Sequence, residues 1–487
     1  MKFLTGSDEN PRSGTGGDGK LREACGVCGI FFDDPSRDAS ALVYYGLFAL
    51  QHRGQESAGI AALHDRTIEC RKGMGLVGEV FNPEHLARIT GPGAVGHVRY
   101  STAGSSTIEN AQPFVSRFKL GSIAVAHNGT LTNADVVREL LEDSGVGFVS
   151  SSDSEVIVNL IAKNYRKGLD RAITDTLKFI KGSYGLVVLT GDALVGARDP
   201  NGIRPLCLGK LEGGWIITSE SCAVDAVGGE FVRDIEPGEV VIINRSQVLS
   251  FSFSEKTRRA VCAFEYVYFA RPDSIIDQVD VYSARIRAGE ILARESAAAA
   301  DLVIGVPDSG IPAAIGYGRA AGIPYGLGIV KSKYVGRTFI SPGQAAREEA
   351  VSVKHNVIPS EVRGKRVVII DDSIVRGTTS RRLVAILRAA GAREVHIRVC
   401  SPPVRVPCYF GIDTPPRTDL IRNVNSVSEL CRSLEADSLA FISIEGLLES
   451  IDNPGYGNTA GRGYCLGCFT GEYPIPVPGE TPQNGSC

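Results

Sequence analysis

VVIIDDSIVRGTTS, residues 367–380, is the most informative stretch of the sequence. Four β-branched residues predict a buried strand over 367–370, and two adjacent aspartates follow it. A turn of Gly, Thr and Ser then leads into a segment of helical composition. In an open α/β sheet, ligands bind at the carboxyl ends of the strands. Asp371 and Asp372 are therefore candidate ligand-binding residues.

The turn after these aspartates has the composition of a phosphate site. Backbone amides at a turn and at a helix N-terminus can hold a phosphate, and Thr378, Thr379 and Ser380 add hydroxyl groups. The two carboxylates suit a sugar diol or a hard divalent cation. Two aspartates after a strand can also serve only as turn and N-cap residues. The preceding strand and the following RGTTS favour the ligand site.

The two halves of the chain differ in their pattern. From residue 256 to residue 487, apolar strands alternate with Ala-rich helices, which predicts a parallel sheet with helices on its faces. From residue 25 to about residue 255, short strands with Gly turns are interrupted by helical stretches, which predicts an α+β sandwich. We therefore expect two domains, 25–255 and 256–487, after a loose N-terminal segment.

Composition excludes several classes of protein. Of 487 residues, 43% are hydrophobic and 22% charged, and the net charge of −3 does not suggest a nucleic-acid partner. No apolar run reaches the ~20 residues of a membrane span. Residues 1–24 lack the ~7 to 15 apolar residues of a secretory signal, so we expect a cytoplasmic protein. Its 12 cysteines are then more often ligands, nucleophiles or buried thiols than disulfides.

Two C-x-x-C pairs occur, in REACGVCGIFF (22–32) and in YCLGCF (464–469). Cys25 and Cys28 begin a predicted strand, so their side chains should point to opposite faces and not share one ion. The second pair lies among glycines, in a turn that could bring two thiolates together. The two pairs are expected to differ in role.

Residues 367–380 resemble the phosphoribosyl pyrophosphate (PRPP) motif of the type I phosphoribosyltransferases. The resemblance implies that Asp371 and Asp372 hold the ribose hydroxyls and help to place Mg²⁺. It also implies a 5-phosphate cradle made of Arg376, Gly377, Thr378, Thr379 and Ser380. GVPDSG (305–310) is similar to the pyrophosphate loop of that family, with Ser309 close to Mg²⁺. Residues 331–356 look like its catalytic flap, with Lys333 and Arg337 expected at the pyrophosphate, although a plain surface loop is the alternative.

Motifs of the first half resemble class II glutamine amidotransferases, whose domain belongs to the N-terminal nucleophile hydrolases. They are CGVCGI, LQHRGQESAGI (50–60), GHVRYSTAG (96–104), AHNGTL (126–131) and SSDSE (151–155), in this order. The resemblance makes Cys25 the nucleophile and residues 1–24 a propeptide. Once they are removed, the α-amino group of Cys25, with a pKa of ~7.7 to 8.0, can act as the base.

The same resemblance assigns the remaining glutamine-site residues. Asn128 and the Gly129 amide should form the oxyanion hole. Arg99 should pair with the α-carboxylate of glutamine and Asp153 with its α-ammonium group, while Arg53 and Thr102 line the pocket. Cys28 stands where a larger apolar residue such as Phe is common in that family. We interpret it as a core substitution without chemistry.

Together the two halves, from about residue 25 to about residue 475, resemble the amidophosphoribosyltransferase family. The implied reaction releases ammonia from glutamine to displace pyrophosphate from C1 of PRPP, the first step of de novo purine (IMP) biosynthesis. The product is 5-phosphoribosylamine. Purine nucleotides are the expected feedback inhibitors, and a homo-oligomer, a tetramer in that family, is the expected assembly.

One branch of this family carries a 4Fe-4S cluster on four cysteines. Cys262, Cys408, Cys465 and Cys468 fall where that branch has them, in a C-terminal cluster-binding tail. A four-cysteine zinc site has the same ligand types and stays open at this point.

Two other functions share part of these motifs. Glucosamine-phosphate synthase shares the first half, but residues 367–380 argue against its sugar-isomerase domains. The phosphoribosyltransferase fold can also serve as a nucleotide-sensing regulator without catalysis. PRPP-dependent release of pyrophosphate separates the enzyme from both.

Overall fold

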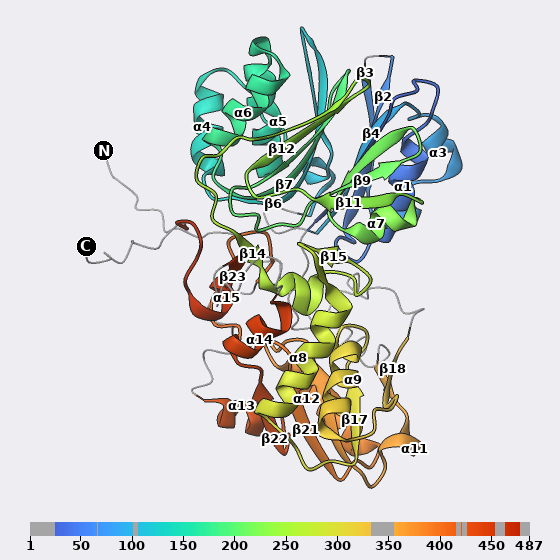
Figure 1. Ribbon diagram of the computed structural model, residues 1–487, viewed down its shortest axis with the longest axis vertical. Helices are drawn as coiled ribbons and strands as arrows, with labels where there is room; N and C mark the ends of the chain where they lie inside the picture. Colours follow the sequence, from blue (N-terminus) through green and yellow to red (C-terminus); the bar gives the residue numbers. More distant parts are fainter. Residues whose placement is uncertain are drawn as a thin grey trace, which may run out of the picture.

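The computed structural model describes residues 25–65, 67–100, 106–332, 355–414, 420, 426–452 and 463–477. Among the predicted site residues, Thr102, Lys333 and Arg337 lie outside these ranges, as do the predicted propeptide 1–24 and most of the predicted flap. Figure 1 shows two bodies, one built from the first half of the chain and one from the second.

The first half contains two antiparallel sheets. The order of the first is β11-β9-β10-β1-β4-β2-β3 and that of the second is β13-β12-β8-β7-β6-β5. The strands of the first sheet are β1 (Gly26–Phe32), β2 (Ser57–His64), β3 (Thr67–Met74), β4 (Gly93–Arg99), β9 (Cys207–Leu211), β10 (Gly214–Thr218) and β11 (Glu230–Asp234). Those of the second are β5 (Phe114–Phe118), β6 (Gly121–Leu131), β7 (Gly182–Leu189), β8 (Ala193–Arg198), β12 (Glu239–Asn244) and β13 (Val248–Ser252).

The two sheets pack face to face, with helices outside them (Figure 1). Along β1, Val27 and Phe31 face the core between the sheets, whereas Cys28 and Ile30 face the helices, as the period of 2 requires. The first sheet is covered by α1 (Ser40–Ala49) and α7 (Ser221–Ala226). The second is covered by α4 (Ala134–Asp143), α5 (Asp153–Asn164) and α6 (Leu169–Phe179). The predicted α+β sandwich is confirmed.

The second half has a four-stranded parallel sheet in the order β17-β20-β21-β22. Alternate residues of the two strands 302–305 and 366–371 enter two separate apolar cores, so both faces of the sheet are covered there. Its strands are β17 (Leu302–Gly305), β20 (Arg366–Asp371), β21 (Glu394–Val399) and β22 (Ser438–Phe441). On one face lie α8 (Val281–Glu295), α9 (Gly310–Ala321) and α14 (Ile444–Ile451), and on the other α12 (Thr378–Ala389) and α13 (Val427–Ser433). The predicted parallel α/β domain is also confirmed.

Short pairings complete the second half. β14 (Ala260–Cys262) lies parallel to β23 (Gly463–Cys465), which joins its two ends. β15 (Ile275–Ile276) pairs with β16 (Val279–Asp280), and β18 (Ile329–Lys331) with β19 (His355–Val357).

The smaller helices of both halves are α2 (Val77–Val80), α3 (Pro83–Ala87), α11 (Pro359–Val362), α15 (Gly467–Thr470), the 3-10 turns η1 (Ile108–Asn110) and η2 (Tyr165–Lys167), and the π-helix η3 (Glu265–Phe269).

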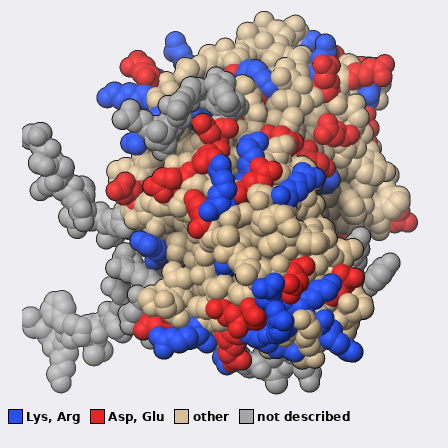
Figure 2. Space-filling model, turned by 60° about the horizontal axis from the view of Figure 1, so that its bottom comes forward, with Lys and Arg blue, Asp and Glu red and all other residues tan. Residues whose placement is uncertain are grey.

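Charged side chains of both signs are interspersed on the face that Figure 2 shows. Two ion pairs of the second half lie near the beginnings of strands: Arg366 with Asp301 at 2.7 Å and Arg388 with Asp437 at 2.5 Å. Such pairs contribute little to stability. Their place at the amino ends of the strands separates them from the carboxyl edge at which a ligand is expected.

Within the described ranges, none of the helices combines the length and the apolar character that crossing a membrane would require.

Candidate active sites

Cys25 immediately precedes β1 and is buried, with 7% of its surface exposed. Its thiol donates to the carbonyl oxygen of Tyr100 at 3.6 Å. Burial raises the pKa of this thiol, while the nearby Arg99 lowers it and Asp153 raises it. The structure therefore brings Cys25, Arg99 and Asp153 together. A thiol that burial keeps protonated needs a base before it can act as a nucleophile.

Asn128 lies on β6 and is fully buried. Neither atom of its side-chain amide has a hydrogen-bond partner among the described residues. Gly129 follows with a φ of +144°, and a Cβ there would lie 2.1 Å from the Ser183 carbonyl oxygen, so only glycine fits. A buried, unpaired amide in a polar site calls for an explanation. An oxyanion accepting from that amide is one that fits.

Asp153 is the first residue of α5. Its carboxylate accepts from the backbone amide of Leu131 at 2.9 Å and lies 3.7 Å from His127 Nδ1. Burial alone would raise the pKa of Asp153, but His127, the Leu131 amide and the Ser154 hydroxyl lower it below its usual value. An ionised carboxylate beside Cys25 suits the ammonium group of an amino acid.

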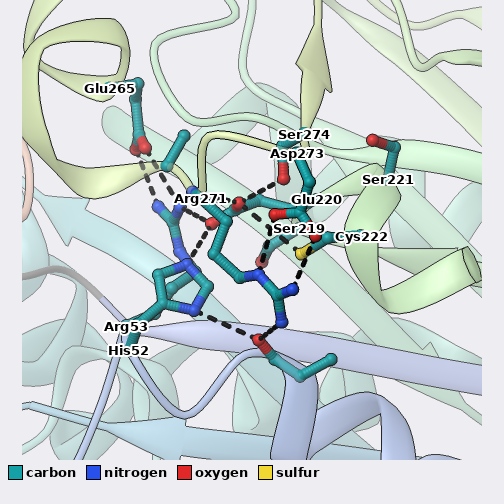
Figure 3. Close-up of polar contacts among 12 residues, drawn as sticks. His52, Arg53, Ser219, Glu220, Ser221, Cys222, Glu265, Arg271, Asp273 and Ser274 are labelled. Atoms are coloured by element: carbon teal, nitrogen blue, oxygen red, sulfur yellow. Dashed lines mark hydrogen bonds and ion pairs between the residues drawn. The ribbon is translucent and has the colours of Figure 1, made fainter. Parts of the chain in front are cut away.

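Arg53 follows α1 and has a fully buried side chain. Its Nε donates to the Cys25 carbonyl oxygen at 3.2 Å. The other two guanidinium nitrogens donate to Glu220 at 2.5 Å and to Glu265 at 2.7 and 3.0 Å, as Figure 3 shows. That Arg53 lines a glutamine pocket stays a prediction, whereas its contacts with the two glutamates are an additional finding.

The sequence did not single out Glu220 or Glu265. Glu265 does carry a signal in its context, because it is an acidic residue inside the apolar run AFEYVYFA. A carboxylate in such a run is buried only when it is paired. Its partner could not be named, because Arg53 is more than 200 residues away in the chain.

The carboxyl edge of the parallel sheet gathers the predicted PRPP residues. β17 and β20 are neighbours, with Gly305 paired to Ile370, so the loops that follow them meet. The Ser309 hydroxyl donates to one oxygen of Asp372, and the Ser373 hydroxyl donates to the other at 2.6 Å. Asp371 and Asp372 are both buried. These oxygens are the ligand type that Mg²⁺ prefers, and it commonly uses only one or two carboxylates plus substrate phosphates.

The predicted phosphate turn lies at the start of α12. Gly377 has a φ of +79°, a conformation that favours glycine, and the helix begins at Thr378 and includes Thr379 and Ser380. Arg376 precedes this turn. A helix of this length presents unpaired amides at its N-terminus, where an anion can bind.

A cavity lies behind this edge. Its lining includes Ser309, Asp372, Tyr266 and Arg285. Arg285 donates to the carbonyl oxygens of Tyr266 at 2.7 Å and Ala270 at 2.8 Å. Residues of the predicted PRPP site and of the π-helix η3 thus line the same cavity.

The four candidate cluster cysteines lie in one region of the second half, but not in the arrangement of a metal site. Cys262 on β14 is the register partner of Cys465 on β23. Burial raises the pKa of Cys262 to about 12, and the pKa of Cys468 is raised first by burial and then by the other three thiols. Cys408 accepts from the Phe410 amide at 3.3 Å. The described residues include no group of three or more His, Cys, Asp or Glu side chains arranged around a single metal ion.

Comparison with known proteins finds a different domain family in each half of the chain. A model of the glutamine amidotransferase domain matches residues 97–226, and one of the phosphoribosyl transferase domain matches residues 281–401. An amidophosphoribosyltransferase of Archaeoglobus fulgidus is 52% identical over 458 residues, which cover 94% of this chain and 99% of that protein. The chain belongs to the amidophosphoribosyltransferase family.

Other members of the amidophosphoribosyltransferase family are also similar to this chain in sequence and in structure. The Bacillus subtilis protein is 48% identical over 95% of this chain and 96% of its own length. A solved structure of the Bacillus subtilis glutamine PRPP amidotransferase, complexed with ADP and GMP, superimposes with a TM-score of 0.87 at 48% identity. It covers 94% of this chain and 99% of that one. Membership in this family sets aside glucosamine-phosphate synthase and the non-catalytic sensor.

Proposed function

We propose that this amidophosphoribosyltransferase joins two chemistries on one chain. Glutamine is hydrolysed at Cys25, and the ammonia displaces pyrophosphate from C1 of PRPP to give 5-phosphoribosylamine. The observation that carries the proposal is the convergence of Cys25, Arg99 and Asp153 in one domain and of Ser309, Asp371 and Asp372 in the other. The reaction is the first of de novo purine biosynthesis.

The glutamine half of the reaction begins once residues 1–24 have been removed. The free α-amino group of Cys25 takes the proton from the thiol, which attacks the side-chain amide carbon of glutamine. Asn128 Nδ2 and the Gly129 amide donate to the tetrahedral oxyanion. The α-ammonium group of Cys25 returns the proton to the leaving nitrogen, and ammonia departs. Water then hydrolyses the thioester to glutamate and restores the thiol.

The remaining glutamine residues bind and orient the substrate. The Arg99 guanidinium pairs with the α-carboxylate, for which its fork of donors is suited, and Asp153 meets the α-ammonium group. Arg53 and Thr102 complete the pocket, Thr102 from outside the described residues. Fixing both ends of the amino acid aims its amide carbon at the Cys25 thiol.

The PRPP half uses the carboxyl edge of the parallel sheet. Asp371 and Asp372 hold the ribose hydroxyls, and the turn from Arg376 to Ser380, with Gly377, Thr378 and Thr379, surrounds the 5-phosphate. Ser309, Asp371 and Asp372 are the residues that would hold Mg²⁺, which when bound neutralises the pyrophosphate leaving group. Lys333 and Arg337, outside the described residues, would meet the pyrophosphate.

Cys262, Cys408, Cys465 and Cys468 are the proposed ligands of a 4Fe-4S cluster. The burial of Cys262 and Cys468, the pairing of β14 with β23 and the effect of the thiols on one another's pKa support this site. A cluster bound there would contribute fold stability, because it cross-links both ends of the second half with the segment that holds Cys408. Zinc remains the alternative for four thiolates.

Cys465→Ser should give a colourless protein of low solubility, because three thiolates and a hydroxyl hold an iron-sulfur cluster poorly. Iron and acid-labile sulfide content and the visible absorption spectrum, measured after anaerobic purification, provide the check. Cys431→Ser is the matched control, since Cys431 lies in the same half and outside the proposed ligand set. Zinc in place of iron, or metal-free wild-type protein, would contradict the cluster.

The proposal also includes the binding partners of the protein and the division of its chain into domains. Purine nucleotides are the proposed feedback inhibitors, and the ADP and GMP in the Bacillus subtilis structure support nucleotide binding. A cytoplasmic homo-oligomer, with a tetramer as the expected form, fits the family. The division into a propeptide (1–24), a glutaminase domain (25–255) and a phosphoribosyltransferase domain with a cluster-binding tail (256–487) belongs to the same proposal.

Pyrophosphate release tests the function. The purified processed protein is incubated with PRPP and Mg²⁺, and either glutamine or ammonium is supplied as the nitrogen donor. We expect pyrophosphate with each donor and none without a donor. A protein that only senses nucleotides would release none in any of the three mixtures.

A further inference from the structure

A buried ion-pair network crosses from the first half of the chain to the second. Glu265, the first residue of η3, accepts from Arg53 through both carboxylate oxygens, at 2.7 and 3.0 Å. It also accepts from Arg204 at 2.9 Å. Glu220 accepts from Arg53 and, through its other oxygen, from Ser274 of the second half at 2.6 Å (Figure 3). The two arginines and two glutamates balance in charge, and all four side chains are fully buried.

This network reaches the predicted nucleophile through a single side chain. That side chain is Arg53. Glu265 binds its two outer guanidinium nitrogens, and its Nε donates to the Cys25 carbonyl oxygen at 3.2 Å. The start of β1 packs on the same side chain, because a Cβ at Gly26 would lie 3.4 Å from Arg53 Cβ and 2.9 Å from Val98. A Cβ at Gly54 would lie 2.6 Å from the Arg99 nitrogen. Arg53 is therefore fixed between the beginning of β1 and the end of β4.

The orientation of Arg53 depends on its acidic partners. Burial alone would lower the pKa of the Arg53 guanidinium, but Glu265 and Glu220 raise it above its usual value, so the group stays charged. A guanidinium bound at two nitrogens by one carboxylate has a defined plane and direction. Its Nε–H is then aimed at one acceptor, the Cys25 carbonyl.

We propose that Glu265, a residue of the second domain, is a positioning residue for glutamine hydrolysis. Acting through Arg53, it holds the Cys25 carbonyl and thereby sets the direction of the amine and thiol on the same residue. This inference rests on the proposed function, in which Cys25 is the first residue of the processed chain. No preceding peptide then restrains Cys25, so the bond to its carbonyl carries much of its orientation.

The segment that contains η3 is also held by Arg285 of α8. Arg285 donates to the carbonyl oxygens of Tyr266 and Ala270, at 2.7 and 2.8 Å. The same arginine lines the cavity that Asp372 and Ser309 also line. The π-helix, a form that often marks functional sites, thus places Glu265 in a segment shared by both candidate sites.

Glu265→Gln in the full, processed enzyme tests the proposal. The amide keeps the shape of the side chain and removes its charge and one acceptor. We expect kcat with glutamine to fall by about 10- to 100-fold, the range that misplacing a reacting group costs, while KM for glutamine changes less than about threefold. Ammonia-dependent activity should stay within about twofold. Alkylation of Cys25 by an electrophilic glutamine analogue, followed by intact mass, should slow in parallel with kcat.

Asp277→Asn is the matched control. Asp277 also lies in the second half, is buried, and binds a fully buried arginine of the first half, Arg198, at 2.9 Å through both oxygens. It also pairs with Arg259 at 2.6 Å, so both variants lose two arginine contacts. Neither Arg198 nor Asp277 donates to or accepts from Cys25. The ratio of glutamine-dependent to ammonia-dependent activity should therefore be unchanged in Asp277→Asn.

Arg53→Lys keeps a cation between the two glutamates but loses the fork that directs Nε to Cys25. It should lower the same ratio, and it decides the test if Glu265→Gln is insoluble. The inference would be overturned if the ratio of glutamine-dependent to ammonia-dependent activity in Glu265→Gln and in Arg53→Lys equalled that in Asp277→Asn.

Cys25→Ala separates this result from a failure of the proposed function. If that variant still uses glutamine, the assignment of the nucleophile itself is wrong.

Discussion

Cys25→Ala is expected to lose glutamine-dependent synthesis of phosphoribosylamine by more than about 10⁴-fold, the order that loss of a covalent nucleophile costs other enzymes. Alanine provides no thiol for attack on the glutamine amide. Activity with added ammonia should persist, because Asp371, Asp372 and Ser309 belong to the other domain. Parallel assays with glutamine and with ammonium chloride, both at saturating PRPP, measure the two activities.

Cys28→Ala provides the control for this substitution. Cys28 lies three residues further along, is fully buried and faces the core under α1 and α7, so its thiol has no access to the glutamine site. Both activities should stay within a few-fold of wild type. Intact mass should show that the active wild-type chain begins at Cys25. A fully active chain that retains Ala24 would refute the role of the Cys25 amine as the base.

Asp371→Asn and Asp372→Asn are expected to lower kcat/KM for PRPP by about 10- to 150-fold each, with glutamine and with ammonia alike. Each substitution removes a charge that bonds the ribose or the divalent cation, and one such charged hydrogen bond contributes about 1.5 to 3 kcal/mol. The two nitrogen donors should be affected equally, because both require PRPP at the same site. Initial rates of pyrophosphate release at varied PRPP and Mg²⁺ give the comparison.

Asp301→Asn is the control for these carboxylates. Asp301 directly precedes β17 and forms an exposed ion pair with Arg366, the first residue of β20, at the opposite end of that strand from Asp371. Its loss should leave kcat/KM for PRPP unchanged, since it lies far from the carboxyl edge. Unchanged PRPP kinetics in Asp371→Asn and Asp372→Asn would show that the ligand binds elsewhere.

The spacing of apolar residues and the order of strands and helices were sufficient to predict the architecture of both halves. The alternation of Val27 and Phe31 with Cys28 and Ile30 is a period of 2, and the structure places the two sets on opposite faces of one sheet. Strand–helix–strand order in the second half likewise predicted a parallel sheet, because such crossovers return the chain in the same direction. That residues 305–310 and 367–380 serve one site was implied only by the family resemblance, and the pairing of β17 with β20 brings the two loops together.

Contacts between residues distant in the chain were not predictable in the same way. Motifs placed Asp371 and Asp372 at a strand end, but no local pattern links Arg53 to Glu220 and Glu265. Each of these three residues lies in a separate segment, and a single sequence gives no distances between segments. The apolar residues around Glu265 do predict that its carboxylate is buried and paired, but they do not say which residue is the partner.

The stoichiometry of one reaction tests the central claim, that glutamine hydrolysis and PRPP substitution belong to a single enzyme. Processed wild-type protein is given glutamine, PRPP and Mg²⁺, and glutamate and pyrophosphate are quantified in the same samples over time. The account predicts that the two products rise together, close to one pyrophosphate for each glutamate, and that neither pyrophosphate nor phosphoribosylamine forms when glutamine is omitted. Glutamate that accumulates without pyrophosphate would contradict it.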